Sequence, residues 1–260
     1  MTTPLIEFRN VTVYQGNRVA LNGLSLSIGQ GENVAILGPN GSGKSTFIKT
    51  ITRELYPRAG APQGMVHILG STGWNIFDLR PLLGIVTQDL LEGCRNDSTA
   101  LEIVLSGFFS SQRIWPWDVV TPIMREKALG LMEFLDISHL VERPMMEMSS
   151  GELRRVVIAR SLVHDPKSLL LDEPTNSLDI RGFMELRSMM RTLAREGVGV
   201  IVVTHHLPDI IPEIHRVVCM KSGSLFWDGP KEEALQPERL RDLFEVDVQV
   251  TQHEGDYWLH

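Results

Sequence analysis

The eight residues from Gly38 to Ser45 constrain the fold of this chain more than any other segment. They read Gly-Pro-Asn-Gly-Ser-Gly-Lys-Ser and follow the short apolar run Asn33–Leu37. Beyond them, apolar residues recur at helical spacing, which predicts a helix over Lys44–Leu55. A glycine-rich loop between a buried strand and a helix is typical of α/β folds that bind phosphate groups. The segment therefore predicts an α/β fold built around this loop.

The loop also has the residue types that a bound triphosphate needs. Its glycines allow backbone N–H groups to turn toward phosphate, and Lys44 can reach the β- and γ-oxygens. Ser45 can ligate Mg²⁺ at the start of a helix, whose dipole favours an anion. A glycine-rich turn that contains Lys-Ser by coincidence is the alternative, and the flanking strand and helix argue against it. We therefore expect ATP and Mg²⁺ at this loop.

Two acidic residues end a second apolar run, Leu169–Leu171. An ionised carboxylate at the tip of a buried strand is costly unless it is paired or binds a cation, so Asp172 is a candidate magnesium ligand. Glu173 would lie one residue nearer the γ-phosphate, where a carboxylate can activate water. The alternative interpretation of this acidic pair is a helix cap.

The rest of the sequence predicts three regions around these motifs. An early antiparallel sheet is expected from strands over 6–13 and 20–28, joined by a turn at 15–17. The stretch from 90 to 148 reads as a helical insertion, with helices over 100–109 and 122–135. Parallel α/β winding then resumes, with helices over 151–163 and 180–194 and buried strands over 168–171 and 198–204. The C-terminal residues predict hairpins around one small helix, Lys231–Leu235.

Composition excludes several other classes of protein. A chain of 260 residues with 43% hydrophobic content can bury one large core, and its longest apolar stretch is far short of a membrane span. We therefore expect a soluble, cytosolic chain unless a partner holds it at a membrane. A net charge of −7 opposes nonspecific binding to nucleic acid. The two cysteines, Cys94 and Cys219, have no paired spacing and are interpreted as idle thiols.

A third motif, Ser149-Ser150-Gly151-Glu152, resembles the signature of ABC-type ATPases. The other motifs follow in that family's order over essentially the whole chain. The resemblance implies a P-loop NTPase of ABC type, with a mixed central sheet, an antiparallel β subdomain and a helical insertion. It implies one domain over 1–260, with the nucleotide-binding core in 1–88 and 149–245, the helical subdomain in 89–148 and a C-terminal β tail in 246–260.

The resemblance also implies roles for individual residues. Phosphates would be held by Gly38, Pro39, Asn40, Gly41, Ser42, Gly43, Lys44, Ser45 and Thr46. The magnesium ion would be organised by Ser45, Gln88 and Asp172, and catalysis would fall to Glu173, His205 and Lys44. Tyr14 would stack on adenine, and Ser149, Gly151 and Asp179 would serve the nucleotide across a dimer. The plainer alternatives are a half-buried Tyr14, a surface Gln88, a helix cap at Asp179 and a core histidine at His205.

The signature departs from the family's usual Leu-Ser-Gly-Gly-Gln at Met148, Ser150 and Glu152. Ser150 must then adopt a backbone conformation that is open to residues other than glycine. Glu152 brings a negative charge close to a negatively charged ligand, which weakens binding unless Arg154, Arg155 or the helix N-terminus compensates.

One set of motifs implies a second ATPase subunit, either another copy or a relative, that closes over two ATP molecules. Family members that transport solutes pass this motion to integral membrane subunits, which places the chain at the cytoplasmic face of a membrane. The expected docking segment runs from Gln88 to Trp117 and includes Gly107–Ser111 and Trp115–Trp117, although these could also pack within the helical subdomain.

Two other functions remain open from the sequence. One is a soluble ABC ATPase that remodels or regulates a protein assembly without transport. The other is a small-molecule phosphotransferase that uses the same loop, which would leave Ser149–Glu152 and His205 without a role. The sequence does not disclose the transported solute or the direction of transport.

Overall fold

The computed structural model describes residues 3–58, 64–75, 79, 81–253 and 255–259. Its largest sheet has the strand order β5-β6-β7-β3-β8-β9. The strands are β3 (Val34–Leu37), β5 (Leu83–Val86), β6 (Ser168–Asp172), β7 (Gly199–Thr204), β8 (Arg216–Lys221) and β9 (Ser224–Pro230). All neighbouring pairs are parallel except β8 and β9, which form an antiparallel hairpin. The mixed central sheet is thus confirmed.

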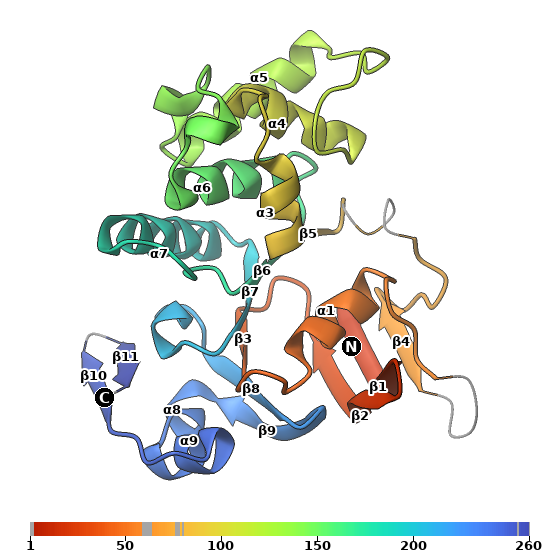
Figure 1. Cartoon of the computed structure of the whole chain (residues 1–260), viewed down its shortest axis with the longest axis vertical. Helices are drawn as coiled ribbons and strands as arrows, with labels where there is room; N and C mark the ends of the chain where they lie inside the picture. The colour runs from red at the N-terminus through yellow and green to blue at the C-terminus, as the bar shows by residue number, and fades with distance from the viewer. Residues whose placement is uncertain (1–2, 59–63, 76–78, 80, 254, 260) are drawn as a thin grey trace.

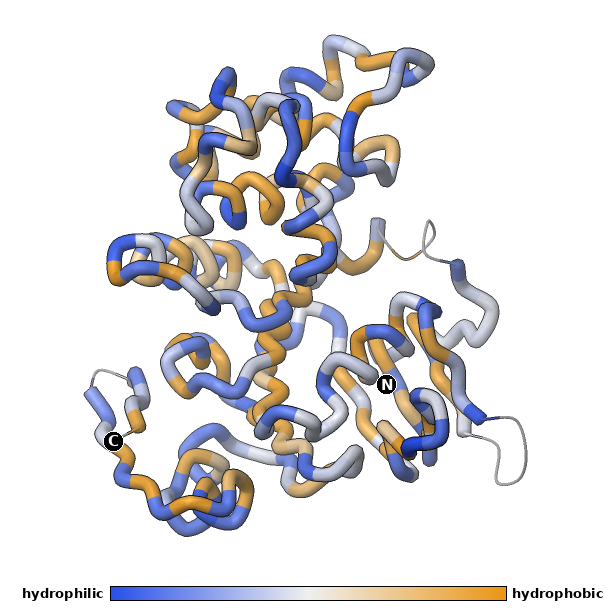
Figure 2. The backbone as a smooth tube through the Cα atoms, in the orientation of Figure 1, coloured by the Kyte–Doolittle hydropathy of each residue, from blue (hydrophilic) through white to orange (hydrophobic). Residues whose placement is uncertain are grey.

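Alternation along the central strands divides the interior into two hydrophobic clusters. In β3, Ala35 and Leu37 belong to one cluster, while Val34 and Ile36 belong to the other. Because successive side chains of a strand point to opposite faces, the sheet separates the two clusters. Strands that are covered on both faces are apolar throughout, and Figure 2 shows the hydrophobic colouring along the middle of the molecule.

A second sheet lies beside the first and is antiparallel, with the order β2-β1-β4. It consists of β1 (Ile6–Gln15), β2 (Arg18–Ile28) and β4 (Met65–Ile68), and β1 and β2 are joined by the turn at 16–17. The early antiparallel sheet is therefore confirmed. No bounds were predicted for the strands β4 and β5, because each has only four residues.

The helices fall into two groups (Figure 1). One group forms the upper part of the molecule and contains α3 (Gln88–Cys94), α4 (Ala100–Ser106), α5 (Pro122–Phe134) and α6 (Ser150–Ser161). The other consists of α1 (Lys44–Ile51), α7 (Ile180–Arg195), α8 (Lys231–Ala234) and α9 (Pro237–Phe244). Since α6 packs on α4 and α5 as well as on α7, it joins the helical insertion to the sheet. The exact division of the chain into subdomains stays a prediction.

Two expected elements were wrong in detail. The helix after the phosphate loop ends at Ile51 rather than Leu55, because Arg53 has a left-handed φ of 63° and Trp74 Nε1 donates to the Ile51 carbonyl at 3.0 Å. The C-terminal region has two helices instead of one, since α9 begins at Pro237 and buries Leu240 and Leu243. It ends in the hairpin of β10 (Val250–His253) and β11 (Asp256–Leu259). Among the described residues, no helix has the length and apolarity needed to cross a membrane.

Candidate functional site

The candidate site lies where four neighbouring parallel strands end. The order β5-β6-β7-β3 places the carboxyl ends of these strands along one edge of the sheet. The phosphate loop follows β3, the acidic pair ends β6, His205 follows β7 and Gln88 follows β5. Ligands of open α/β sheets bind at this edge, so topology brings together residues that are far apart in sequence.

The phosphate loop is held in shape by close backbone contacts. A Cβ atom on Gly38 would lie 2.3 Å from the Met220 carbonyl, so no larger residue fits there. Gly43 caps α1 with a φ of 103°, a conformation that favours glycine. Ser45 is exposed and is the second residue of α1. The loop thus leads into a helix N-terminus, as the sequence predicts.

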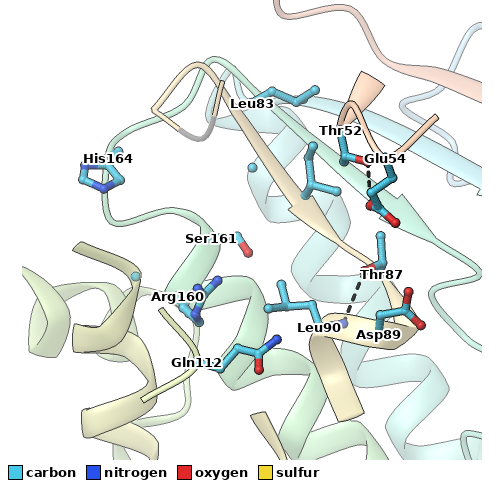
Figure 3. A pocket seen from close by; sticks show the side chains of 13 residues that line it. Thr52, Glu54, Leu83, Thr87, Asp89, Leu90, Gln112, Arg160, Ser161 and His164 are labelled. Carbon is cyan, nitrogen blue, oxygen red and sulfur yellow. Dashed lines mark hydrogen bonds between the residues drawn. The ribbon is translucent and has the colours of Figure 1, made fainter. Parts of the chain in front are cut away.

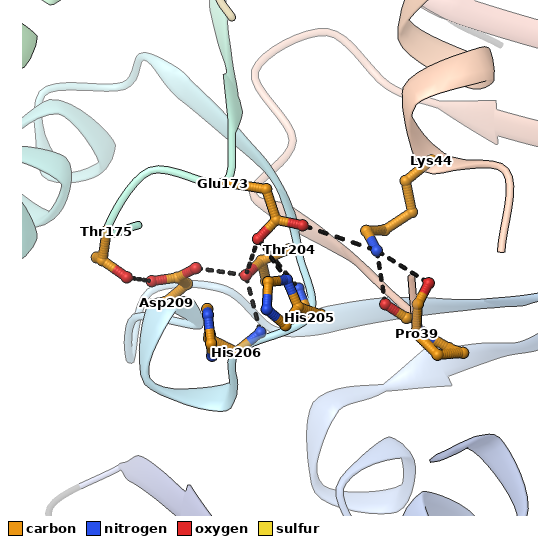
Figure 4. A network of polar contacts seen from close by, with 9 residues as sticks. Pro39, Lys44, Glu173, Thr175, Thr204, His205, His206 and Asp209 are labelled. Atoms are coloured by element: carbon orange, nitrogen blue, oxygen red, sulfur yellow. Dashed lines mark hydrogen bonds and ion pairs between the residues drawn. The ribbon is translucent and has the colours of Figure 1, made fainter. Parts of the chain in front are cut away.

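Lys44 is buried and points along the loop toward the acidic pair (Figure 4). Its Nζ donates to the carbonyl oxygens of Gly38 at 2.6 Å and Pro39 at 3.2 Å, and lies 3.7 Å from Glu173 Oε1. Burial lowers the pKa of the Lys44 ammonium, and the carboxylates of Glu173 and Asp172 oppose that shift. The loop and the acidic pair are therefore in direct electrostatic contact.

Asp172 lies at the tip of β6 in a partly buried position. Burial raises the pKa of this carboxyl to about 6 from its usual 3.8, the charge of Glu173 adds to the shift, and Lys44 opposes it. A carboxylate that is costly to ionise without a cation is a natural ligand for a divalent metal ion. The raised pKa of Asp172 is therefore consistent with the expected magnesium role.

We expect the Asp172→Asn variant to be more stable than the native chain at pH 7.5 in EDTA, by about 3 kcal/mol. The folded pKa of Asp172 lies above its unfolded value, so the ionised carboxylate destabilises the fold at neutral pH. The advantage of asparagine should shrink as the pH falls through about 6 and vanish below about 4. Urea unfolding at several pH values measures it. Asp247→Asn, at an exposed position, is the control; a gain that does not change with pH would contradict the assignment.

Glu173 occupies a strained backbone position. Its φ is 46°, which is uncommon for a residue other than glycine, and its N–H donates to the Val203 carbonyl at 2.8 Å. Strained residues of this kind concentrate at functional sites. The side chain reaches β7, where Oε2 lies 2.8 Å from His205 Nδ1 and 3.3 Å from the Thr204 hydroxyl oxygen. The structure thus brings together the three residues predicted for catalysis, Lys44, Glu173 and His205.

His206 adds a second imidazole beside this group, with its ring centroid 3.8 Å from that of His205. Donor atoms of Glu173, His205 and His206 all lie within 4.8 Å of one another. Two imidazoles and one carboxylate suit zinc better than magnesium, which prefers oxygen ligands. The magnesium role expected of Ser45, Gln88 and Asp172, which offer oxygen donors, stays a prediction.

Asp209 is a site residue that the sequence analysis missed. It is fully buried, and its two carboxylate oxygens accept hydrogen bonds from the hydroxyls of Thr175 and Thr204 (Figure 4). Burial raises the pKa of Asp209, and the two hydroxyl donors oppose the shift. Asp209 thereby ties the loop after Glu173 to the end of β7. An acidic residue within the otherwise apolar run Leu207–Ile211 was the available signal.

The signature motif forms the start of α6. Ser149 is the N-cap, and its hydroxyl accepts from the Glu152 N–H while Glu152 Oε2 accepts from the Ser149 N–H at 2.9 Å. Ser150 is the first residue of α6, and its φ is not in the left-handed region, which residues with a side chain rarely adopt. Gly151 is buried, and an added Cβ would lie 3.2 Å from the Gly182 Cα atom of α7. Close packing of α6 against α7 therefore favours glycine at position 151, independently of any role in nucleotide binding.

The charge of Glu152 is compensated partly as expected, by Arg155 and by the Ser149 N–H at the helix N-terminus, and partly by Arg143, which was not expected. Arg154 turns away and donates to the carbonyls of Pro174 and Asn176, so it is not the compensating residue. Arg143 lies closest, with Nη1 2.7 Å from Glu152 Oε1. Burial would raise the pKa of Glu152, but the hydrogen bonds from Ser149 and the charges of Arg143 and Arg155 hold it below its usual value.

Three other predicted residues are placed without a test of their roles. Asp179 caps α7 by accepting from the Gly182 N–H at 2.7 Å, which is the plainer interpretation. Gln88 begins α3 and lines a cavity of about 120 Å³ together with Ser150 and Ser177. Tyr14, near the end of β1, is half-buried, and the Arg58 guanidinium lies 4.9 Å from its ring centroid. Their contacts with nucleotide stay predictions.

Comparison with known proteins gives concordant matches. The ABC transporter family model matches residues 21–176. A hemin import ATP-binding protein from Bradyrhizobium diazoefficiens is 33% identical over 259 residues, which cover 96% of this chain and 92% of that protein. An ATP-binding cassette of an ABC transporter in its ADP conformation has a TM-score of 0.78 at 27% identity, covering 94% of this chain and 98% of that chain. A dimeric cassette in a post-hydrolysis state with ADP and phosphate has a TM-score of 0.69 at 27% identity, covering 86% of this chain and 98% of that chain.

Proposed function

The chain belongs to the ABC transporter family and is an ATP-hydrolysing subunit, and on that premise we propose how its residues share the work. The loop Gly38–Thr46 holds the phosphates of ATP, with Lys44 over the β- and γ-oxygens. Mg²⁺ is held by Ser45 and Asp172 with help from Gln88. The observation that carries this proposal is the single cluster of Lys44, Glu173 and His205 at the ends of β3, β6 and β7.

Hydrolysis then follows from the positions of the side chains. Glu173 Oε2 is placed to take a proton from the attacking water, because its other oxygen faces Lys44 and its backbone is fixed by Val203. His205, 2.8 Å from the same oxygen, orients that carboxylate and contacts the γ-phosphate. Lys44 stabilises the charge on the transferred phosphoryl group.

Dimerisation completes the site. One solved cassette of this family is a dimer in a post-hydrolysis state with ADP and phosphate. We place Ser149 and Gly151 of one copy against the γ-phosphate bound by the other, in a C2 arrangement. Tyr14 stacks on adenine, and Asp179 lies at the dimer seam. Loss of the phosphate bridge after hydrolysis separates the copies.

A groove beside α3 is suited to a membrane subunit (Figure 3). It measures about 360 Å³ and is lined by Leu83 and Thr87 of β5 and its end, Leu90 of α3, and Ser161 of α6. The floor therefore joins the strand that leads to Gln88 with the helix that begins at the signature. A partner segment in this groove would sense both ends of the nucleotide site, which is why we place the coupling contact here.

The aromatic segment after the groove divides into two parts. Phe108 packs on the helical core and its ring meets His164 edge-on, with centroids 5.7 Å apart. Trp115 and Trp117 stack on each other, and Trp117 is 72% exposed. The first part supports the packing interpretation and the second supports docking. We assign Trp115–Trp117 to the contact with the membrane subunit, at the cytoplasmic face of the membrane.

Co-purification tests this coupling. A tagged chain isolated from detergent-solubilised membranes of its own host should bring hydrophobic membrane subunits with it. Ser161→Trp, which fills the groove, should remove those subunits while phosphate release by the isolated chain stays within about twofold. Ser188→Trp, on the exposed side of α7, is the matched control and should keep them. Recovery of soluble assembly proteins instead would favour the remodelling alternative.

A further inference from the structure

Arg143 lies in the turn before the signature and has a fixed backbone. Its N–H donates to the Leu140 carbonyl at 2.9 Å, and its carbonyl accepts from the Ala100 N–H at 3.0 Å, at the start of α4. The following residue, Pro144, forms an isolated bridge with Thr99. These contacts anchor Arg143 to the helical insertion and determine where its side chain begins.

The guanidinium of Arg143 makes two separate contacts. Nη1 donates to Glu152 Oε1 at 2.7 Å, and Nη2 donates to the Glu147 carbonyl at 2.9 Å. The planar fork of arginine satisfies both acceptors at once, which a lysine ammonium at one point cannot do. The Glu152 side chain is 20% exposed and that of Arg143 41% exposed, so the pair is partly shielded from solvent.

Glu152 divides its two oxygens between Arg143 and the signature. Oε1 takes the guanidinium, while Oε2 takes the Ser149 N–H and closes the capping box. The carboxylate thus holds the residue that is expected to meet the γ-phosphate of the other copy. It also places a negative charge within the same turn as that phosphate contact, and like charges repel.

We propose that Arg143 is a positioning residue for ATP-driven dimerisation: it neutralises Glu152 and holds it in the capping box, so that Ser149 can face the γ-phosphate of the second copy. The inference rests on the proposed function, because it requires the signature to meet nucleotide across a dimer. It explains how this chain uses Glu152 where the family usually has glutamine. Glutamine can accept the Ser149 N–H without bringing a charge.

The test measures dimerisation of the Glu173→Gln chain at saturating ATP by analytical ultracentrifugation. Adding Arg143→Ala should raise the dimer dissociation constant about tenfold or more, because Glu152 loses its ion-pair partner near phosphate. ATP affinity of the monomer should stay within about twofold. Adding Glu152→Gln to the Arg143→Ala chain should restore dimerisation to within about threefold of the parent, since the repelling charge is gone. Arg195→Ala is the control, because it removes another arginine that pairs with a glutamate: Arg195, at the end of α7, pairs with Glu213.

A purely structural Arg143 gives a different outcome. Its loss would then damage dimerisation equally with glutamate or glutamine at 152, and the absence of rescue would overturn the inference. Ionic strength gives a second readout: the Arg143→Ala defect should shrink when the salt is raised from about 0.05 to about 0.5 M, because the Debye length falls from about 14 Å to about 4 Å and screens the repulsion. A Glu173→Gln parent that stays monomeric with ATP would overturn the proposed function itself. A parent that dimerises equally well without Arg143 would overturn only this inference.

Discussion

In the Glu173→Gln variant we expect ATP turnover to fall by about 10²-fold or more, while ATP binding is kept. The amide has nearly the same shape as the carboxylate and can still pack beside the Thr204 hydroxyl oxygen, which lies 3.3 Å from Oε2. It cannot take a proton from water, so the chemical step loses its base. Phosphate release under saturating ATP measures turnover, and equilibrium binding of a fluorescent ATP analogue measures affinity.

The same variant should accumulate as an ATP-bound dimer, because the phosphate that joins the two copies is no longer cleaved. Light scattering with size-exclusion chromatography detects the change in mass. Glu196→Gln makes the same chemical change at an exposed residue after α7 and should alter neither measurement. Turnover within about twofold of the native chain would show that Glu173 is not the base.

The second large effect is expected from Lys44→Ala, which should weaken ATP binding by about 10²-fold or more. Lys44 is only 6% exposed, and its ammonium donates hydrogen bonds to the Gly38 and Pro39 carbonyls within the loop. A methyl group cannot replace its contact with the β- and γ-oxygens. Isothermal titration with Mg-ATP gives the dissociation constant.

Two additional measurements separate binding from folding in this variant. Lys49→Ala removes an ammonium from the last turn of the same helix and should leave ATP affinity within about twofold. Circular dichroism of Lys44→Ala should keep the native spectrum, since the rest of α1 is held by Phe47, Ile48 and Ile51 in the core. A folded Lys44→Ala chain with native ATP affinity would contradict the assigned role.

Most of the fold could be predicted from local patterns in the sequence. Apolar runs such as Val34–Leu37 are short, continuous and followed by glycine or acid, which marks buried parallel strands and their carboxyl ends. The phosphate loop and the pair Asp172-Glu173 could be found for the same reason, because each of these motifs consists of consecutive residues. The order of the parallel strands then places both motifs at the same edge of the sheet.

Contacts between distant segments could not be predicted in this way. Thr175 and Asp209 are hydrogen-bonded across 34 residues, and neither has a local pattern that names the other. The nearest compensating charge for Glu152 comes from Arg143, nine residues earlier, because a turn and a bridge to Thr99 return the chain to the start of α6. Neighbours on the helix, such as Arg154, were closer in sequence but point to the loop after Glu173. The direction of each side chain determines which residues are in contact, and that direction depends on the folded chain.

The turn between β8 and β9 ties the phosphate loop to the antiparallel sheet. Gly223 donates its N–H to the Ser42 carbonyl at 2.9 Å and accepts from the Asn22 N–H at 2.8 Å. An added Cβ on Gly223 would lie 2.7 Å from the Ala20 carbonyl, so the three segments meet with no spare room. The entropy of ordering this loop is therefore lost when the chain folds and not when nucleotide arrives, which favours tight binding through preorganisation.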